Sequence, residues 1–338
     1  MDLNVLWFTL LGVLLAGYAI LDGFDLGVGI MYLGARGDRE KRLLLNSIGP
    51  LWDGNEVWLV AFGGALFAAF PHAYATVFSA YYLAFMLLLC ALIFRAVSLE
   101  YRGKRESQVW RGFFDACFFG ASTLATLLFG VTVGNSMVGI PVDENMEYAG
   151  GFFNLLKPFP IVVGLFSVAL FAMHGSIYLY LKTEGALQKR VRVWMWRSFF
   201  IFLVLYVVVS VYAIIAVPAA TRNLSLSPWL WLVVILNVLA VANIPRAISQ
   251  DRPMHAFITS CCSIAALVFL FMTALYPNLV LSSLAPEWCL TIRNAASSEK
   301  TLVIMAIIAA IGMPLALAYT AIVYWIFRGK VKLGKFSY

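Results

Sequence analysis

The chain has 338 residues, of which 62% are hydrophobic and 12% are charged, and it carries a net charge of +7. Soluble domains have about 45–50% apolar and about 25% charged residues, and a chain of this size cannot bury so much apolar surface in one soluble core. The positive charge does not indicate nucleic-acid binding, because the basic residues form short clusters between long apolar runs. The composition therefore predicts a protein that crosses a membrane several times.

Nine apolar runs have roughly the length of a spanning helix, which is about 20 residues. In chain order they cover residues 5–31, 56–70, 73–94, 112–135, 159–181, 198–217, 229–244, 255–276 and 302–327. The second run is short, but Pro50 can begin its helix and place the acids that follow in the first turn. We therefore expect an all-α polytopic membrane protein with about nine transmembrane helices.

The basic residues are distributed unequally between the two sides of these runs. Twenty of the 24 Lys and Arg residues follow the first, third, fifth, seventh and ninth runs. Cytoplasmic loops are enriched in Lys and Arg, so the N-terminus is predicted outside and the C-terminus in the cytoplasm. The first run has neither a basic segment before it nor an Ala-x-Ala site after it, which favours a retained helix over a cleaved signal peptide.

Small residues in the first two runs predict close helix packing. Gly23 and Gly27 have the GxxxG spacing in the first run, and Gly63 and Gly64 are expected to serve the second run in the same way.

Two acids within the first run are candidates for function. Asp22 and Asp25 are three residues apart, so they share one face of a helix, and Asp25 is expected about 10 Å inside the cytoplasmic end. Lipid does not solvate a carboxylate, and intramembrane acids often mark proton paths or partner surfaces. The alternative is a structural carboxylate bonded to a neighbouring helix, for which Arg95 is a candidate partner.

A second cluster, Trp-Asp-Gly-Asn-Glu-Val-Trp, opens the second run and contains Asp53 and Glu56 between Trp52 and Trp58. Acids in the first turn of a helix also interact with its dipole, which contributes about 0.3–1 kcal/mol per charge. The two indoles fit an interfacial aromatic belt equally well. Because both acidic clusters flank one short basic loop, they approach the same membrane face, and we expect the functional site there.

The sequence indicates no metal or haem site. The histidines are His72, His174 and His255; no two are four residues apart, and Cys-x-x-Cys-His does not occur. The five cysteines lack metal-ligand spacing and are expected to act as small buried hydrophobes. A P-loop and a dinucleotide-binding fingerprint are also missing, which argues against a nucleotide-driven pump.

Several motifs in order resemble subunit II of the cytochrome bd-type quinol oxidases, including the cyanide-insensitive relatives. The matching segments include Asp-Gly-Phe-Asp-Leu-Gly-Val-Gly at 22–29, Asn-Ser-Ile-Gly-Pro at 46–50, Trp-Asp-Gly-Asn-Glu-Val-Trp at 52–58, Gly-Ala-Leu-Phe-Ala-Ala-Phe-Pro at 64–71, Phe-Phe-Asn-Leu-Leu at 152–156, and Tyr-Trp at 324–325. The similarity covers essentially the whole chain. The outer loop at 218–228 departs from it, because some members have a longer insert there.

The resemblance implies two four-helix bundles, at about 1–136 and about 158–277, and a peripheral ninth helix at about 301–327. It implies a multi-pass protein of the bacterial cytoplasmic membrane that forms a heterodimer with a haem-bearing subunit I. That partner holds haem b and haem d, oxidises quinol and reduces dioxygen to water, whereas subunit II ligates no haem. Some members carry a structural quinone in an apolar groove, and the complex can include a small single-helix accessory subunit.

The resemblance also ranks the acids. Asp53, with Trp52 beside it, matches an acid that lies against subunit I and is proposed to pass protons from the cytoplasm toward haem d. Asp25 matches a second acid of such a path, and Asp22 and Glu56 are further candidates. Protons taken from the cytoplasm make oxygen reduction electrogenic without a pump.

Two other functions stay open from the sequence. The first is a proton-coupled secondary transporter with Asp22 and Asp25 as its site, although the paired broken helices typical of such proteins are not evident. The second is a scaffold that only stabilises subunit I, for which the acids have no role in turnover. Co-purification with a haem-bearing subunit distinguishes the transporter from the other two.

Overall fold

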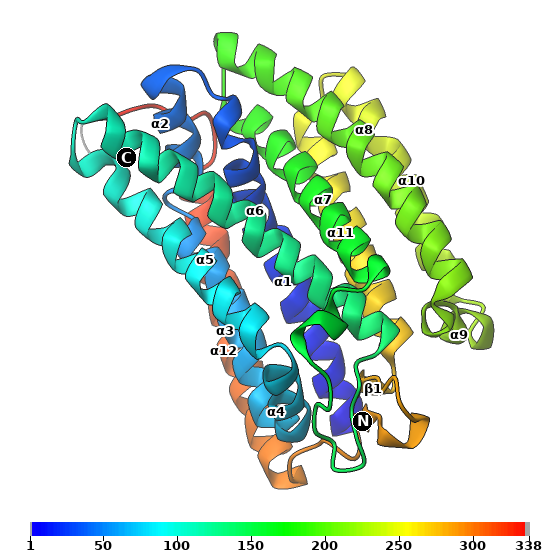
Figure 1. Cartoon of the computed structure of the whole chain (residues 1–338). Helices are drawn as coiled ribbons and strands as arrows, with labels where there is room; N and C mark the ends of the chain where they lie inside the picture. The colour runs from blue at the N-terminus through cyan, green and yellow to red at the C-terminus, as the bar shows by residue number, and fades with distance from the viewer. Residues whose placement is uncertain (1, 335–338) are drawn as a thin grey trace.

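The computed structural model describes residues 2–334, and most of them are helical. Nine long helices run along one bundle (Figure 1): α1 (Leu3–Met31), α3 (Trp52–Ala69), α5 (Tyr82–Tyr101), α6 (Gln108–Val138), α7 (Pro158–Lys182), α8 (Gly185–Ala216), α10 (Leu230–Ser249), α11 (Pro253–Leu275) and α12 (Glu299–Ile326). Three shorter helices connect them: α2 (Gly37–Ile48), α4 (Pro71–Ala80) and α9 (Pro218–Leu226). Two short antiparallel strands, β1 (Asn278–Val280) and β2 (Leu290–Thr291), lie between α11 and α12.

The predicted all-α polytopic class is confirmed. Within residues 2–334, eight helices are long and apolar enough to cross a membrane, and each overlaps one of the predicted runs. The remaining run, 56–70, corresponds to α3, which has 18 residues and is not among the eight. Its first turns carry Asp53, Asn55 and Glu56, so its apolar part is shorter than a full span.

The first and last helices run parallel. At one end of the bundle the Trp7 indole of α1 donates a 3.0 Å hydrogen bond to the Leu302 carbonyl of α12. At the other end the Tyr324 hydroxyl of α12 donates to Asn55, which itself bonds to α1. The Ala69 carbonyl at the far end of α3 accepts from the backbone N–H of Ser297, just before α12. The first and last helices of the described chain therefore place its two ends at opposite ends of the bundle.

Two predicted boundaries differ from the structure. The run 73–94 was expected as one helix, but the chain breaks at Tyr81 between α4 and α5, and Pro71 occupies the first turn of α4. Helix α8 begins at Gly185, well before residue 198, because the basic stretch that precedes its apolar run is also helical. Lys and Arg are good helix formers, so this extension continues the helix beyond the apolar run.

Helix α1 lies at the centre of the bundle and packs closely on α7. A Cβ atom at Gly27 would lie 1.9 Å from the Phe171 carbonyl oxygen and 2.9 Å from the Cα of Gly175. The predicted close approach at Gly27 is therefore confirmed. The same prediction for Gly63 and Gly64 is wrong within this chain, because a Cβ atom at either position meets nothing within 4 Å.

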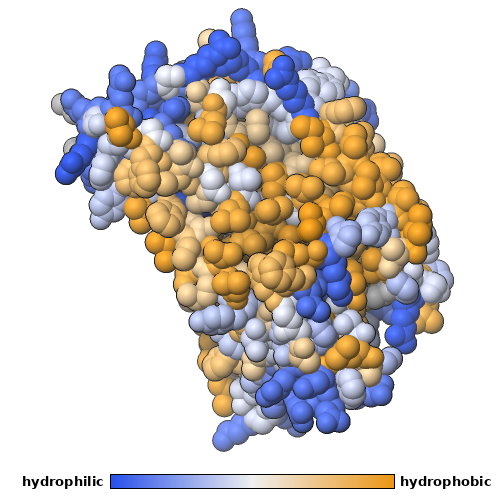
Figure 2. Space-filling model, in the orientation of Figure 1, coloured by the Kyte–Doolittle hydropathy of each residue, from blue (hydrophilic) through white to orange (hydrophobic). Residues whose placement is uncertain are grey.

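The surface has the polarity of a membrane protein. On the face shown in Figure 2, apolar side chains form a broad band across the middle, and hydrophilic side chains gather at the two ends. Large apolar side chains on α3, α8 and α12 are strongly exposed, among them Val60, Ile215 and Leu315. Continuous exposed apolar surface on this scale fits contact with lipid or with another membrane protein.

Candidate functional site

The two acids of α1 are buried but have different partners. The Arg95 guanidinium of α5 binds Asp22 through two hydrogen bonds, with 2.7 Å between Nη1 and Oδ2 and a second bond from Nη2 to Oδ1. The Asp22 side chain has 0% exposure and that of Arg95 has 1%. The structural pairing considered from the sequence therefore holds for Asp22, and it joins α1 to α5.

Asp25 does not share this arginine. Its Oδ2 accepts a 2.7 Å hydrogen bond from the Asn55 side chain of α3. Its Oδ1 is buried and has no hydrogen-bond partner among the described residues. A buried carboxyl oxygen without a partner is uncommon and calls for an explanation, such as a role in proton transfer or a bound water.

Asn55 connects three helices. Its Nδ2 donates to Asp25 and also to the Leu21 carbonyl of α1, at 3.2 Å. Its Oδ1 accepts a 2.9 Å hydrogen bond from the Tyr324 hydroxyl of α12, 269 residues away in sequence. Asn55 belongs to the Trp-Asp-Gly-Asn-Glu-Val-Trp motif, but no local pattern distinguishes it from its acidic neighbours.

The acids of α3 extend from this buried site to the surface. Asp53 is exposed in the first turn of α3, where the helix dipole favours its charge, and the helix has no side-chain cap in the described structure. Glu56 lies one turn further along and is partly buried, within electrostatic reach of Asp53, Asp22 and Arg95. The structure thus brings Asp25 and Glu56 within electrostatic reach of the Asp22–Arg95 pair and leaves Asp53 at the edge.

The two tryptophans of the motif both contact protein. Trp52 is partly buried and packs against the main apolar core. The Trp58 ring lies over Gly17 of α1, where a Cβ atom would approach it to 2.2 Å. The two indoles therefore do more than lie at the membrane interface, because each also packs α3 against its neighbours.

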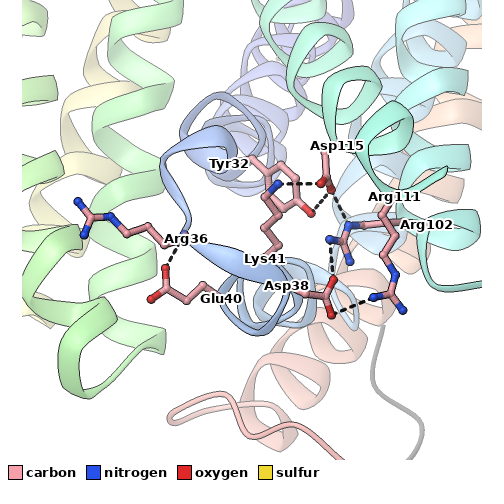
Figure 3. A network of polar contacts seen from close by, with 8 residues as sticks. All are labelled: Tyr32, Arg36, Asp38, Glu40, Lys41, Arg102, Arg111 and Asp115. Carbon is pink, nitrogen blue, oxygen red and sulfur yellow. Dashed lines mark hydrogen bonds and ion pairs between the residues drawn. The ribbon is translucent and has the colours of Figure 1, made fainter. Parts of the chain in front are cut away.

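A second polar cluster lies where α2 meets the ends of α5 and α6 (Figure 3). Asp115 of α6 accepts hydrogen bonds from Tyr32 at 2.7 Å, Lys41 at 2.8 Å and Arg102 at 2.5 Å. Arg102 also binds Asp38 at 2.9 Å. From the sequence, these basic residues predict only the orientation of the chain in the membrane, whereas in the structure several of them also hold the connecting segments in place. The one sign of this cluster in the sequence is Asp115, a single aspartate near the start of the predicted run 112–135.

The same end of the bundle contains an ion pair between Glu40 of α2 and Arg190 of α8. Partial burial opposes ionisation of Glu40, but hydrogen bonds from the Arg190 side chain and from the Arg36 backbone N–H outweigh it. The pKa of Glu40 is therefore lowered from its ordinary value.

The histidines do not form a ligand set. The His174 ring is fully buried in α7, with Nδ1 2.7 Å from the Ser260 hydroxyl and Nε2 3.0 Å from the Ile20 carbonyl. Both of its nitrogens are thus occupied by protein. His72 and His255 are exposed, and among the described residues no group of three or more His, Cys, Asp or Glu residues is arranged to hold a metal ion.

The fold and this site define a polytopic membrane protein with a polar site between α1, α3, α5 and α12. A family model described as cytochrome bd terminal oxidase subunit II matches residues 3–327. The chain belongs to this family, as its motifs predicted.

Individual relatives agree over nearly their whole length. Cytochrome bd-I ubiquinol oxidase subunit 2 of Escherichia coli K12 is 36% identical over 361 residues, which covers 97% of this chain and 95% of that protein. Cytochrome bd ubiquinol oxidase subunit 2 of Bacillus subtilis 168 is 32% identical over 333 residues, covering 98% and 97%. The bd oxidase structure from Geobacillus thermodenitrificans contains a chain with the same fold, at a TM-score of 0.79 and 18% identity, with coverage of 97% and 99%.

Proposed function

We propose that this chain is the haem-free subunit of a cytochrome bd-type quinol:oxygen oxidoreductase in the bacterial cytoplasmic membrane. In this proposal it forms a heterodimer with a haem-bearing subunit I and supplies that partner with protons from the cytoplasm. The haems of the partner supply the chemistry of oxygen reduction. Family membership supports the complex, and the acids of α1 and α3 support the proton path.

The observation that carries the proton path is the charge imbalance around Arg95. This arginine is already bound through two hydrogen bonds to Asp22, while Asp25 is equally buried and has no cation of its own in the described chain. A buried carboxylate without a counter-ion costs several kcal/mol. We therefore expect Asp25 to hold a proton, and Asp22 to serve as the counter-ion that keeps Arg95 in place.

The carboxyls then form a series from the buried site to the surface. Asp25 and Glu56 are within electrostatic reach of each other, and Glu56 is similarly close to Asp53. In the proposal, protons enter from the cytoplasm at Asp53 and move along this series toward subunit I. Trp52 beside Asp53 would form part of the same contact.

The exposed side of α3 is the proposed surface for subunit I. It carries Asp53 near one end, and Gly63 and Gly64 further along leave open space rather than packing in this chain. Small residues let another helix approach closely in a membrane, and a partner would shield Asp53 from lipid. The predicted orientation, with the N-terminus outside and the C-terminus in the cytoplasm, places this acid at the cytoplasmic side.

The test is oxygen consumption by the assembled complex across pH. Asp53→Asn and Asp25→Asn should each keep the haems in the partner but slow quinol-driven oxygen reduction, and the slowing should deepen as pH rises because protons become scarcer. Glu106→Gln is the matched control, since it removes an exposed carboxylate from another connecting segment. Unchanged rates at every pH for both aspartate variants would leave the chain a scaffold, and failure to co-purify with a haem-bearing subunit would favour a transporter.

A further inference from the structure

The orientation of the Asn55 side chain is fixed by its neighbours. The Leu21 carbonyl can only accept a hydrogen bond, so the amide nitrogen of Asn55 must face it. The amide oxygen therefore faces the Tyr324 hydroxyl, which must donate to it. A turned-over amide would lose the bond to the Leu21 carbonyl, because two acceptor oxygens would then face each other.

This orientation determines where Asp25 can hold a proton. Asn55 uses one hydrogen of its nitrogen for the Leu21 carbonyl and the other for Oδ2 of Asp25. Oδ2 is thus an acceptor at this contact, and the carbonyl oxygen of a protonated carboxyl accepts a hydrogen bond better than its hydroxyl oxygen does. A protonated Asp25 carries its proton on Oδ1, the buried oxygen that has no partner among the described residues.

We propose that Asn55 and Tyr324 are positioning residues that hold the Asp25 carboxyl with its exchangeable proton on Oδ1. The inference rests on the proposed proton path and adds to it the orientation of one member. It also gives α12 a role in the path, although this helix lies at the periphery and has little buried surface.

The contacts of Tyr324 separate its ring from its hydroxyl. The ring packs edge-on against Phe24 of α1, with 6.4 Å between ring centroids and an interplanar angle of 82°. A phenylalanine at this position would keep that contact. The hydroxyl adds the bond to Asn55, so removing it alone tests the positioning role.

The charged and titratable groups around Asp25 lie on five helices. They are Asp22 of α1, Glu56 of α3, Arg95 of α5, Tyr178 of α7 and Tyr324 of α12. Tyr178 already donates to the Ser47 carbonyl at 2.6 Å. Tyr324 acts on Asp25 through the neutral side chain of Asn55. Loss of the hydrogen bond between Tyr324 and Asn55 therefore leaves the number of charges in the site unchanged.

The experiment compares Tyr324→Phe with Tyr319→Phe in the assembled, haem-loaded complex. Tyr319 lies on the same helix but its side chain is 64% exposed, so it controls for loss of a hydroxyl from α12. Loss of one hydrogen bond corresponds to about a 2- to 10-fold effect. Tyr324→Phe should lower oxygen consumption by about this factor, more strongly at high pH, while Tyr319→Phe keeps the parent profile.

A second measurement does not depend on turnover. Difference infrared spectra of the complex should contain a carboxylic-acid carbonyl band that Asp25→Asn removes. Tyr324→Phe should shift this band, because Asn55 is then free to move, and Tyr319→Phe should not. Absence of an Asp25 band in the parent protein would overturn the inference.

The outcomes distinguish this inference from the function on which it rests. If Asp25→Asn slows turnover and Tyr324→Phe changes neither turnover nor the band, the proton path stands and the positioning role is wrong. If Asp25→Asn also has no effect, the proton path itself fails. In a double-mutant cycle, Asn55→Ala combined with Tyr324→Phe should be no worse than Asn55→Ala alone, and additive losses would show that Tyr324 does not act through Asn55.

Discussion

Replacement of Arg95 by alanine should be among the most damaging single changes in the chain. The Arg95 and Asp22 side chains have 1% and 0% exposure, and they are joined by two hydrogen bonds. Arg95→Ala leaves Asp22 buried next to Asp25 without a cation. Removing one partner of a buried ion pair costs about 3–5 kcal/mol. The smaller value already lowers the ratio of folded to unfolded protein on the order of a hundredfold.

The assay is thermal unfolding of the purified chain in detergent, with assembly into the complex as a second readout. Arg190→Ala is the matched control, because it removes an arginine from the partly exposed pair with Glu40, whose side chains have 25% and 18% exposure. Pairs of that kind contribute about 0–1 kcal/mol. The double variant Asp22→Leu/Arg95→Met should recover much of the loss, since it removes both charges and keeps similar volume.

Two results would refute this reasoning. The first is that Arg95→Ala is no more destabilising than Arg190→Ala, which would mean that Asp22 gains water or another partner at little cost. Alternatively, the double variant could be as unstable as Arg95→Ala alone, and the arginine would then matter through its packing rather than its charge.

Three further predictions follow from the packing, charge and topology of the chain. Gly27→Ala should prevent stable folding because its Cβ would lie 1.9 Å from a carbonyl oxygen of α7, whereas Gly63→Ala, which meets nothing within 4 Å, should leave the unfolding temperature of the isolated chain unchanged. Glu40→Gln should lower the free energy of unfolding by about 1 kcal/mol or less at neutral pH. Because the folded-state pKa of Glu40 is lowered, the stability difference between Glu40→Gln and the parent should shrink as pH falls below the ordinary value of 4.5 and vanish below the folded-state pKa. Thermal melts at a series of pH values measure this difference, and a difference that stays constant with pH would contradict the prediction. A cysteine introduced at Asn145 should react with a membrane-impermeant reagent added to sealed cells, and one introduced at Gly37 should not; labelling at Gly37 would reverse the proposed topology.

The number and order of the spanning helices were largely predictable from sequence. A helix in lipid satisfies its own backbone hydrogen bonds, so its existence depends on the length and composition of one segment. The predicted runs therefore locate α1, α6, α7, α11 and α12 closely. The prediction was less complete at α3, because its polar first turns serve the site and weaken the local signal.

The partners of the buried acids were decided only by the tertiary structure. Spacing places Asp22 and Asp25 on one face of α1, but three residues correspond to a rotation of about 300°, so the two side chains diverge by about 60°. In the folded chain, this difference directs Asp22 to Arg95 on α5 and Asp25 to Asn55 on α3.

The contact between Tyr324 and Asn55 spans 269 residues, and the bond between Tyr32 and Asp115 spans 83. No local pattern specifies such pairs, because they depend on how each helix is rotated and on which neighbours it packs against. The sequence by itself determined that acids lie inside a membrane-spanning bundle near one face. Packing of α1, α3, α5 and α12 decided which acid is neutralised by an arginine and which is left with a free oxygen.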